Sequence, residues 1–97
     1  MPTEMATPLP DVVLYSRSGC GLCDETRQVL QGLLEERAAH GLAIAHFRER
    51  DIETDEALQR EMFDRIPVVE LRGRRLELAV SAAKLRRFLA DGLDVVA

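Results

Sequence analysis

This chain lacks the features that mark membrane-spanning and secreted proteins. No apolar run in its 97 residues approaches the roughly 18 residues that a membrane-spanning helix needs. No basic segment followed by an apolar one stands near the N-terminus, as it would in a secretory signal. The sequence therefore predicts no membrane partner and a cytoplasmic location.

Aromatic side chains and positive charge are also scarce. The chain has no tryptophan, one tyrosine and three phenylalanines, and its 13 Lys and Arg residues are outnumbered by 17 Asp and Glu residues, for a net charge of −4. Proteins that bind nucleic acid usually present a basic surface, with aromatic side chains on which single-stranded bases stack. We therefore expect no nucleic-acid partner.

The overall composition is that of one globular domain. Hydrophobic residues make up 46% and charged residues 31%, which is usual for a folded domain, and 97 residues are enough for a single core. Residues 1–10 hold three prolines and no periodicity, so we expect a flexible N-terminal tail there. The domain is then expected at residues 11–92, with a C-terminal tail at 93–97.

Hydrophobic periodicity predicts seven elements, in the order strand, helix, strand, helix, strand, strand, helix. The strands are expected at residues 11–16, 42–51, 67–71 and 75–78, and the helices at 21–40, 54–64 and 82–90. The first strand–helix–strand unit needs a parallel crossover, whereas the Arg72-Gly73-Arg74 turn makes an antiparallel hairpin of the last two strands. The predicted fold class is therefore α/β, a mixed four-stranded sheet flanked by three helices in the order βαβαββα.

Glycines and charges indicate where these elements end or pack. Gly41 and Gly92 follow helical patterns and predict helix ends, while Ser81 predicts the start of the last helix. Gly32, inside the long helix, predicts close packing on the sheet. The charged residues 48–51 predict that the second strand is frayed there or lies at an edge of the sheet.

Any thiol chemistry of this chain must occur at Cys20 and Cys23, because they are its only cysteines. In a chain without a leader we expect a reducing compartment, where a cysteine pair is more often catalytic or metal-binding than structural. An apolar strand and a short Ser-Arg-Ser-Gly loop lead directly into the pair, which opens the first predicted helix.

The position at a helix start favours a reactive thiol. A thiol attacks only as its thiolate, and the unpaired N–H groups and dipole of a helix N-terminus lower the pKa of a cysteine there. We expect Cys20 to be the more exposed and more acidic thiol. Cys23, one turn into the helix, is expected to be buried and to react second. The spacing also brings the two sulfurs close enough for a disulfide.

Three motifs together resemble the thioredoxin superfamily and, within it, the small glutaredoxin-like proteins. They are the run from Leu14 to Cys23, the segment Arg65-Ile66-Pro67-Val68-Val69, and Gly73 six residues after that proline. The resemblance covers about residues 12–89. It implies a thioredoxin-like (glutaredoxin-like) sandwich and a thiol–disulfide oxidoreductase that uses neither a metal nor an organic cofactor.

The resemblance also implies residue roles at the cysteine pair. Cys20 would be the nucleophile and Cys23 the resolving thiol. Arg17 stands where glutaredoxins usually have a basic residue that supports the thiolate or a glutathione carboxylate. Gly21 and Leu22, between the cysteines, would contact the substrate.

A second set of roles follows from the proline motif. Pro67 matches the family's cis-proline, which packs beside the cysteine pair, and the backbone of Ile66 would pair with an extended peptide or with glutathione. The implied partners are a disulfide-containing protein or small thiol, together with a reductase or glutathione as reductant. We expect the chain to act as a monomer.

Two departures from the glutaredoxin pattern count against glutathione as the co-substrate. Gly21-Leu22 replaces the usual Pro-Tyr between the cysteines. Glu77-Leu78 and Val80 stand where glutaredoxins have a Gly-Gly pair and an acidic residue that hold glutathione. The short glutaredoxin-like proteins with a Cys-x-Leu-Cys motif match better.

Three alternatives remain open for the cysteine pair. It could be a buried pair without a role, or it could join His40 and His46 in a two-Cys/two-His zinc site. It could also hold an iron–sulfur cluster between the Cys20 residues of two chains. Each binding alternative makes the chain a metal or cluster carrier rather than an enzyme.

Overall fold

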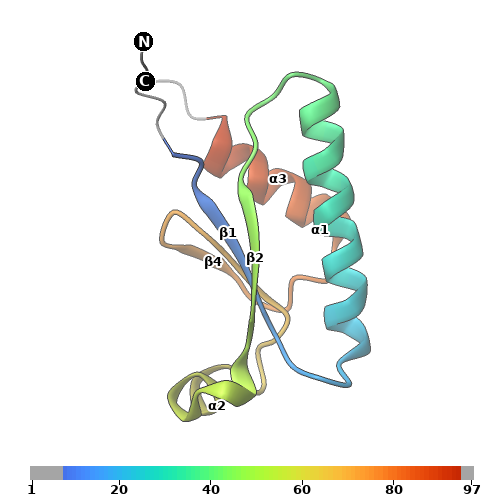
Figure 1. Cartoon of the computed structure of the whole chain (residues 1–97). Helices are drawn as coiled ribbons and strands as arrows, with labels where there is room; N and C mark the ends of the chain where they lie inside the picture. The colour runs from blue at the N-terminus through green and yellow to red at the C-terminus, as the bar shows by residue number, and fades with distance from the viewer. Residues whose placement is uncertain (1–7, 95–97) are drawn as a thin grey trace.

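The apolar strand expected at residues 11–16 lies inside the sheet of the computed structural model, which describes residues 8–94 (Figure 1). The elements are β1 (Asp11–Ser16), α1 (Gly21–Ala39), β2 (His46–Asp51), a 3-10 turn (Ile52–Thr54), α2 (Glu56–Met62), β3 (Val68–Leu71), β4 (Arg74–Leu76) and α3 (Ala82–Leu93). The predicted order βαβαββα is confirmed. Most of the predicted tails, residues 1–10 and 93–97, lies outside the described residues.

The sheet has the strand order β2-β1-β3-β4. β1 pairs in parallel with β2 and antiparallel with β3, and β3 continues into the antiparallel β4. The predicted mixed four-stranded sheet is therefore confirmed. The side chains of β1 enter a buried cluster on each face of the sheet, Val12 and Leu14 on one face and Tyr15 with the half-buried Val13 on the other, which accounts for its continuous apolar run.

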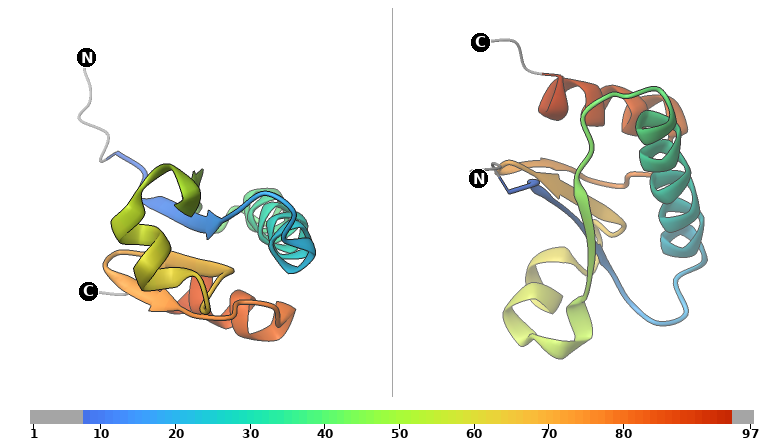
Figure 2. Two further views of the ribbon diagram at one scale, coloured as in Figure 1. Left: turned by 90° about the horizontal axis from the view of Figure 1, so that it is seen from below. Right: turned by 45° about the horizontal axis from the view of Figure 1, so that its top comes forward.

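Helices α1 and α3 cover one face of the sheet, and the short α2 lies on the other side at one end (Figures 1 and 2). The main core fills the space under α1 and α3. It includes Leu14, Leu30, Val69, Leu71, Leu85 and Leu89. A second buried cluster beneath α2 reaches the cysteine pair and contains Tyr15, Cys23, Ile52, Met62, Ile66 and Val68.

Strand β2 begins at His46, so the prediction of a strand from residue 42 is wrong. The ladder cannot start earlier, because β1 begins only at Asp11, which pairs with His46, and Pro10 before it has no N–H to donate. The carbonyl of Ala43 instead accepts a hydrogen bond from Nε of the buried Arg37 at 2.6 Å. The Arg37 side chain of α1 thus supplies the hydrogen bond that the Ala43 carbonyl does not receive from the sheet.

The charged half of β2 is fully paired with β1, as far as Asp51 opposite Ser16. The predicted edge position is confirmed, and fraying does not occur. An edge strand leaves its outer side chains in solvent, so charged residues cost little there.

The hairpin between β3 and β4 turns on two residues. Arg72 (φ 52°) and Gly73 (φ 78°) both adopt the left-handed conformation that a tight two-residue hairpin requires. Strand β4 runs over Arg74–Leu76 rather than 75–78. The chain leaves the sheet here because the N–H of Leu78 bonds to the carbonyl of Arg65 instead of to β3.

The predicted helix caps at Ser81 and Gly41 are confirmed, but the roles predicted for Gly32 and Gly92 are wrong. Helix α3 continues through Gly92 to Leu93. A Cβ on Gly92 would lie 2.5 Å from Cδ2 of Leu71, whereas a Cβ on Gly32 would meet nothing within 4 Å. Gly92 is therefore the glycine that allows a helix to pack closely on the sheet.

We expect the same substitution at these two glycines to have opposite effects on stability. Gly32→Ala should raise the free energy of unfolding by about 0.5–1 kcal/mol, because alanine favours an exposed helix interior. Gly92→Ala should lower it by about 1–2 kcal/mol, because the new methyl group overpacks the buried Leu71. Urea unfolding of both variants measures the difference, and equal stabilisation by the two would show that Leu71 has room to move.

Candidate active site

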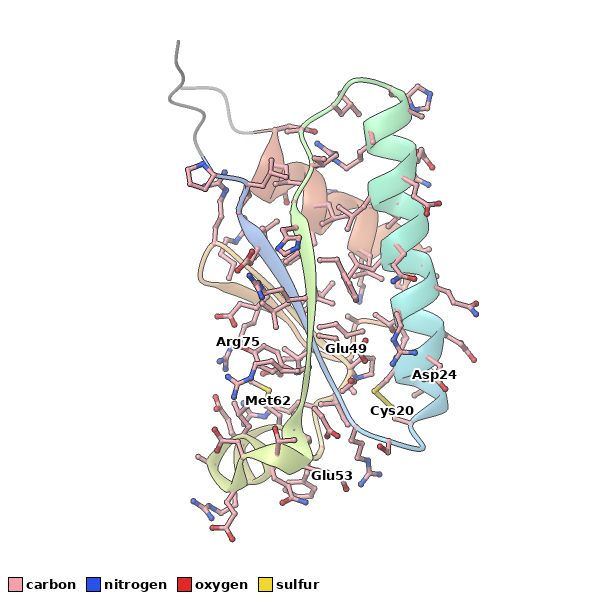
Figure 3. The ribbon with its side chains drawn as sticks, in the orientation of Figure 1. Cys20, Asp24, Glu49, Glu53, Met62 and Arg75 are labelled. Atoms are coloured by element: carbon pink, nitrogen blue, oxygen red, sulfur yellow. A yellow bond between two sulfur atoms is a disulfide. The ribbon has the colours of Figure 1, made fainter. Side chains whose placement is uncertain are left out.

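Cys20 and Cys23 form a disulfide at the start of α1, with their Cα atoms 5.2 Å apart (Figure 3). Cys20 caps the helix. Its backbone is extended (φ −91°, ψ 100°), and its Sγ accepts a hydrogen bond from the backbone N–H of Cys23 at 3.1 Å. The first N–H groups of a helix have no partner within the helix. The sulfur of Cys20 therefore takes the place that a capping oxygen usually fills.

The two cysteines differ in their access to solvent. Cys23 is 0% exposed and belongs to the buried cluster beneath α2. Cys20 packs against the same cluster but is only half-buried. An incoming disulfide can therefore reach Cys20 and not Cys23.

The loop between β1 and α1 turns the chain so that Cys20 can cap the helix. Gly19 has φ +79°, a conformation that a side chain would strain, and the N–H of Cys20 donates to the carbonyl of Arg17 at 3.4 Å. Arg17, Gly21 and Leu22 are all exposed around the disulfide. The three residues that the resemblance assigned to substrate contact are thus on the accessible side.

The Ile66–Pro67 peptide bond is cis, as the resemblance implied. Ile66 and Cys23 belong to the same buried cluster, so the proline turn lies against the cysteine pair. The N–H of Ile66 already donates to the carbonyl of Met62 at 3.1 Å. A peptide lying along this segment can therefore pair only with the carbonyl oxygen of Ile66.

A groove of about 600 Å³ lies next to the loop that precedes Cys20. It lies between Arg17, in the loop before Cys20, and α2 with the exposed Phe63 just beyond it. Glu56, Gln59 and Arg60 complete its lining, so the groove wall combines charged and polar side chains with one apolar ring. The resemblance assigned Arg17 to the site and gave no role to Phe63.

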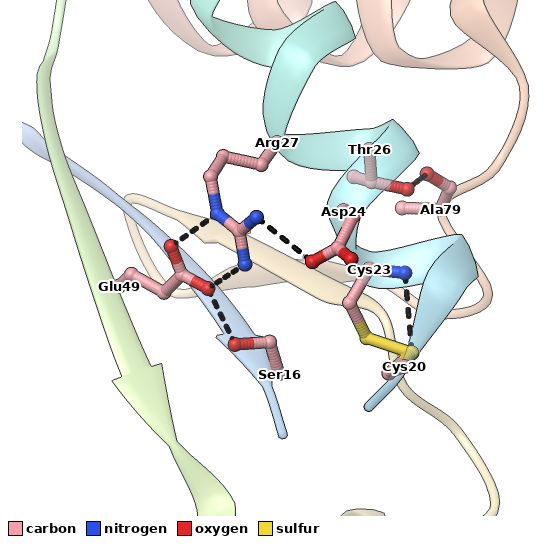
Figure 4. The surroundings of a disulfide bond; sticks show 8 residues. All are labelled: Ser16, Cys20, Cys23, Asp24, Thr26, Arg27, Glu49 and Ala79. Atoms are coloured by element: carbon pink, nitrogen blue, oxygen red, sulfur yellow. Dashed lines mark hydrogen bonds and ion pairs between the residues drawn. A yellow bond between two sulfur atoms is a disulfide. The ribbon is translucent and has the colours of Figure 1, made fainter. Parts of the chain in front are cut away.

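A polar network joins the edge strand β2 to the first turns of α1 beside the disulfide (Figure 4). Arg27 donates to Glu49 at 2.7 and 2.6 Å and to Asp24 at 2.9 Å, and the buried hydroxyl of Ser16 donates to Glu49 at 2.6 Å. The Arg27 guanidinium lowers the pKa of Glu49, and burial opposes that shift. The network holds β2 against the helix that carries both cysteines.

Sequence reasoning missed this network. Strand alternation could have found part of it, because Glu49 falls on the same face as the inward-facing Phe47. Its pairing with Arg27, 22 positions away in the sequence, depends on how α1 lies over the sheet.

The four residues of the zinc alternative do not meet. His40 follows the last residue of α1, a helix of 19 residues, while the cysteines lie at its first turn. At a rise of 1.5 Å per residue, the two ends of this helix are roughly 28 Å apart. Within residues 8–94 there is no group of three or more His, Cys, Asp and Glu residues placed to hold a metal ion.

Comparison with known proteins agrees with this geometry. The sequence profile described as a glutaredoxin-like domain (DUF836) matches residues 11–90. No match was found among curated proteins. Among residues 8–94, no helix has the length and apolar character needed to cross a membrane.

Three solved structures are similar to this chain. Protein XcR50 from X. campestris is 31% identical over 82% of this chain and 96% of its own, with a TM-score of 0.67. Protein Ne2328 from Nitrosomonas europaea is 22% identical over 86% of this chain and 93% of its own, with a TM-score of 0.63. The germline-specific thioredoxin Deadhead from Drosophila melanogaster is 23% identical over 86% of this chain and 80% of its own, with a TM-score of 0.59.

The last two structures support the thioredoxin-like fold alone, whereas the profile covers nearly all of the described chain. With its Cys20–Cys23 pair at the start of α1, the chain belongs to the glutaredoxin-like domain family (DUF836) and has a thioredoxin-like α/β fold.

Proposed function

We propose that this protein is a thiol–disulfide oxidoreductase in which Cys20 is the nucleophile and Cys23 the resolving thiol. In the reduced protein the Cys20 thiolate attacks one sulfur of a substrate disulfide. A bond forms between that sulfur and Cys20, and the other substrate sulfur leaves as a thiolate that takes a proton from water.

Cys23 then loses its proton to solvent and attacks Sγ of Cys20. The mixed disulfide breaks, the second substrate thiol is released, and the Cys20–Cys23 disulfide remains. Two electrons have passed from the protein dithiol to the substrate. A thiol reductant, either one dithiol or two monothiols, restores the starting state.

The observation that carries this proposal is the hydrogen bond from the N–H of Cys23 to Sγ of Cys20 at the half-buried helix cap. The same N–H is positioned to stabilise negative charge on that sulfur once the disulfide is reduced. Cys23 lies in the buried cluster and reaches Cys20 without any change of fold. These features support one attacking thiol and one resolving thiol.

The proposed substrate contacts surround the half-buried Cys20. Arg17 supplies a positive charge on one side, and the exposed Gly21 and Leu22 leave the helix start open. The carbonyl of Ile66, held by Pro67, is available to an extended backbone. This arrangement supports protein or low-molecular-weight disulfides as substrates, with a thiol reductant such as glutathione or a reductase.

The alternative of a metal or iron–sulfur carrier on the same pair has no observation in its favour among the described residues. A carrier needs ligands beyond the two thiolates, and within residues 8–94 no group of three or more His, Cys, Asp and Glu residues is placed to hold a metal ion. We therefore favour thiol–disulfide exchange over metal or cluster binding. A chelator distinguishes the two functions, because it should change the reactivity of the thiols only if they hold a metal.

Single turnover tests the proposal directly. The reduced protein is mixed with a symmetric peptide disulfide at pH 7 without added reductant, quenched in acid and analysed by mass spectrometry. We expect two peptide thiols per protein, and a rate about tenfold or more above that of dithiothreitol at equal dithiol concentration, because an activated cysteine is more fully ionised at this pH. A rate no higher than that of dithiothreitol would contradict the proposed function.

A further inference from the structure

Leu78 combines two features that a folded chain usually avoids. Its backbone has φ 49°, a left-handed conformation that the Cβ of leucine disfavours, and its side chain is 57% exposed. The other non-glycine residue with positive φ among residues 8–94 is Arg72, which lies in the hairpin turn. Strained conformations persist where the surrounding structure imposes them, often at functional sites.

The backbone on both sides of Leu78 is tied to the walls of the cysteine site. The N–H of Leu78 donates to the carbonyl of Arg65 at 2.9 Å, and the N–H of Ala79 donates to the carbonyl of Pro67 at 2.8 Å. On the other side, the buried hydroxyl of Thr26 in α1 donates to the carbonyl of Ala79 at 2.7 Å. Leu78 is therefore held between the proline turn and the cysteine-bearing helix, with its side chain in solvent.

Two more exposed apolar side chains lie in the same place. Leu22 precedes Thr26 by four residues, so it lies on the same strip of α1, one turn closer to Cys20. Val80 follows Ala79. Leu22 and Val80 are each 51% exposed, and with Leu78 they are the exposed apolar side chains of the two segments that the Thr26–Ala79 hydrogen bond brings together; we call these three residues the apolar rim.

The arginine whose backbone adjoins this rim is already paired. Arg65, whose carbonyl holds Leu78, forms ion pairs with Glu77 at 3.2 Å and Asp64 at 3.9 Å. The three side chains of the rim itself are apolar. A small anionic disulfide gains little from such a surface, whereas an apolar side chain next to a protein cysteine loses contact with water on it.

We propose that Leu78 is a specificity-determining residue. With Leu22 and Val80 it contacts an apolar side chain adjacent to the reacting cysteine of a protein disulfide, so the protein prefers polypeptide disulfides flanked by apolar residues. This inference rests on the proposed function and names the substrate class of the same site. The backbone of Leu78, tied to Arg65 next to the proline turn, keeps an exposed apolar side chain on a segment that flanks the cysteine site.

The test compares two symmetric peptide disulfides that differ only in the residue before cysteine, leucine in one and serine in the other. The measured quantity is the ratio of their single-turnover rate constants with the reduced protein. We expect the leucine peptide to react about tenfold faster, the effect of partly burying one aliphatic side chain. In Leu78→Asn the ratio should fall to about one.

Asparagine is chosen because it tolerates the left-handed conformation, so only the apolar surface is removed. Leu42→Asn is the matched control, since Leu42 is 48% exposed beyond the far end of α1 and should leave the ratio unchanged. Leu78→Met, which restores an apolar side chain, should restore most of the preference. Thermal unfolding of all three variants verifies that each is folded.

The outcomes separate this inference from the proposed function. If the wild-type protein reduces both peptides at the same rate, or if Leu78→Asn keeps the wild-type ratio, Leu78 does not determine specificity although exchange still occurs. If the wild-type protein reacts with neither peptide faster than dithiothreitol does, the proposed function itself is wrong.

Discussion

Cys20→Ser should lower the single-turnover rate by on the order of a thousandfold or more, as removal of a nucleophile does in other covalent catalysts. The serine hydroxyl is not ionised near neutral pH and cannot replace a thiolate in disulfide exchange. Cys20 is also the only one of the two cysteines that solvent reaches, since Cys23 is fully buried. No second thiol is therefore available to substitute for it.

Cys23→Ser should give a different result, because the first attack does not need Cys23. The Cys20 thiolate still forms a bond with the substrate, but no neighbouring thiol resolves it, so the mixed disulfide accumulates. Intact-protein mass spectrometry after an acid quench should find one peptide bound per protein. Because the pair is close, with Cα atoms 5.2 Å apart, we expect the wild-type protein not to accumulate this species.

The two variants control for each other. Serine has nearly the size of cysteine, but its hydroxyl enters the buried apolar cluster in Cys23→Ser and stands at the half-buried helix cap in Cys20→Ser. Thermal unfolding therefore verifies that both variants are folded, and a difference in reactivity between folded variants reports the chemical role of the thiol. Equal residual activity in the two variants, or a peptide adduct that forms equally in both, would contradict the assigned roles of Cys20 and Cys23.

Alkylation of the reduced protein should distinguish the two thiols by at least about a hundredfold at pH 7, because only the exposed thiolate at the helix cap is both ionised and accessible. In the reduced protein the N–H of Cys23 and the helix dipole are placed to favour the charged form of Cys20, so we expect the pKa of Cys20 to lie below that of a free cysteine. The rate at Cys20 should therefore reach its half-maximum at a lower pH than that of a model thiol.

Cys23→Ser reports this titration for Cys20 alone, and Cys20→Ser reports Cys23 alone. The protein as purified, before and after treatment with a chelator, provides the comparison for a metal. Two thiols that react alike with an ordinary pKa would mean that the helix start does not activate Cys20. Two thiols protected until a chelator is added would favour the metal-binding alternative.

Local signals explain why the element order and the cysteine position were predictable. The run from Val12 to Tyr15 is apolar without alternation, and a strand inside a sheet needs just that pattern. Arg72-Gly73 marks a tight turn by its glycine. Each pattern depends on residues within a few positions of one another, so the sequence is sufficient to predict the strand and the turn.

The start of β2 and the roles of two glycines were not predictable in this way. Residues 42–45 look like the beginning of a strand, yet their partner strand starts only at Asp11, and Arg37 satisfies the carbonyl of Ala43. Gly32 and Gly92 stand in similar helical patterns. Only the approach of Leu71 from β3 distinguishes them.

The sequence by itself determined the α/β order and the Cys-x-x-Cys pair at a helix start, whereas the cis-proline turn was implied by the resemblance to glutaredoxin-like proteins. The tertiary structure decided what surrounds the pair: the Glu49–Arg27 contact, the Thr26–Ala79 hydrogen bond and the exposed apolar side chain of Leu78. Secondary structure and capping depend on residues close along the chain. The surroundings of the site come from segments far apart in the sequence, as in the bond between Thr26 and Ala79, which are 53 positions apart, and these meet only when the sheet and its helices pack together.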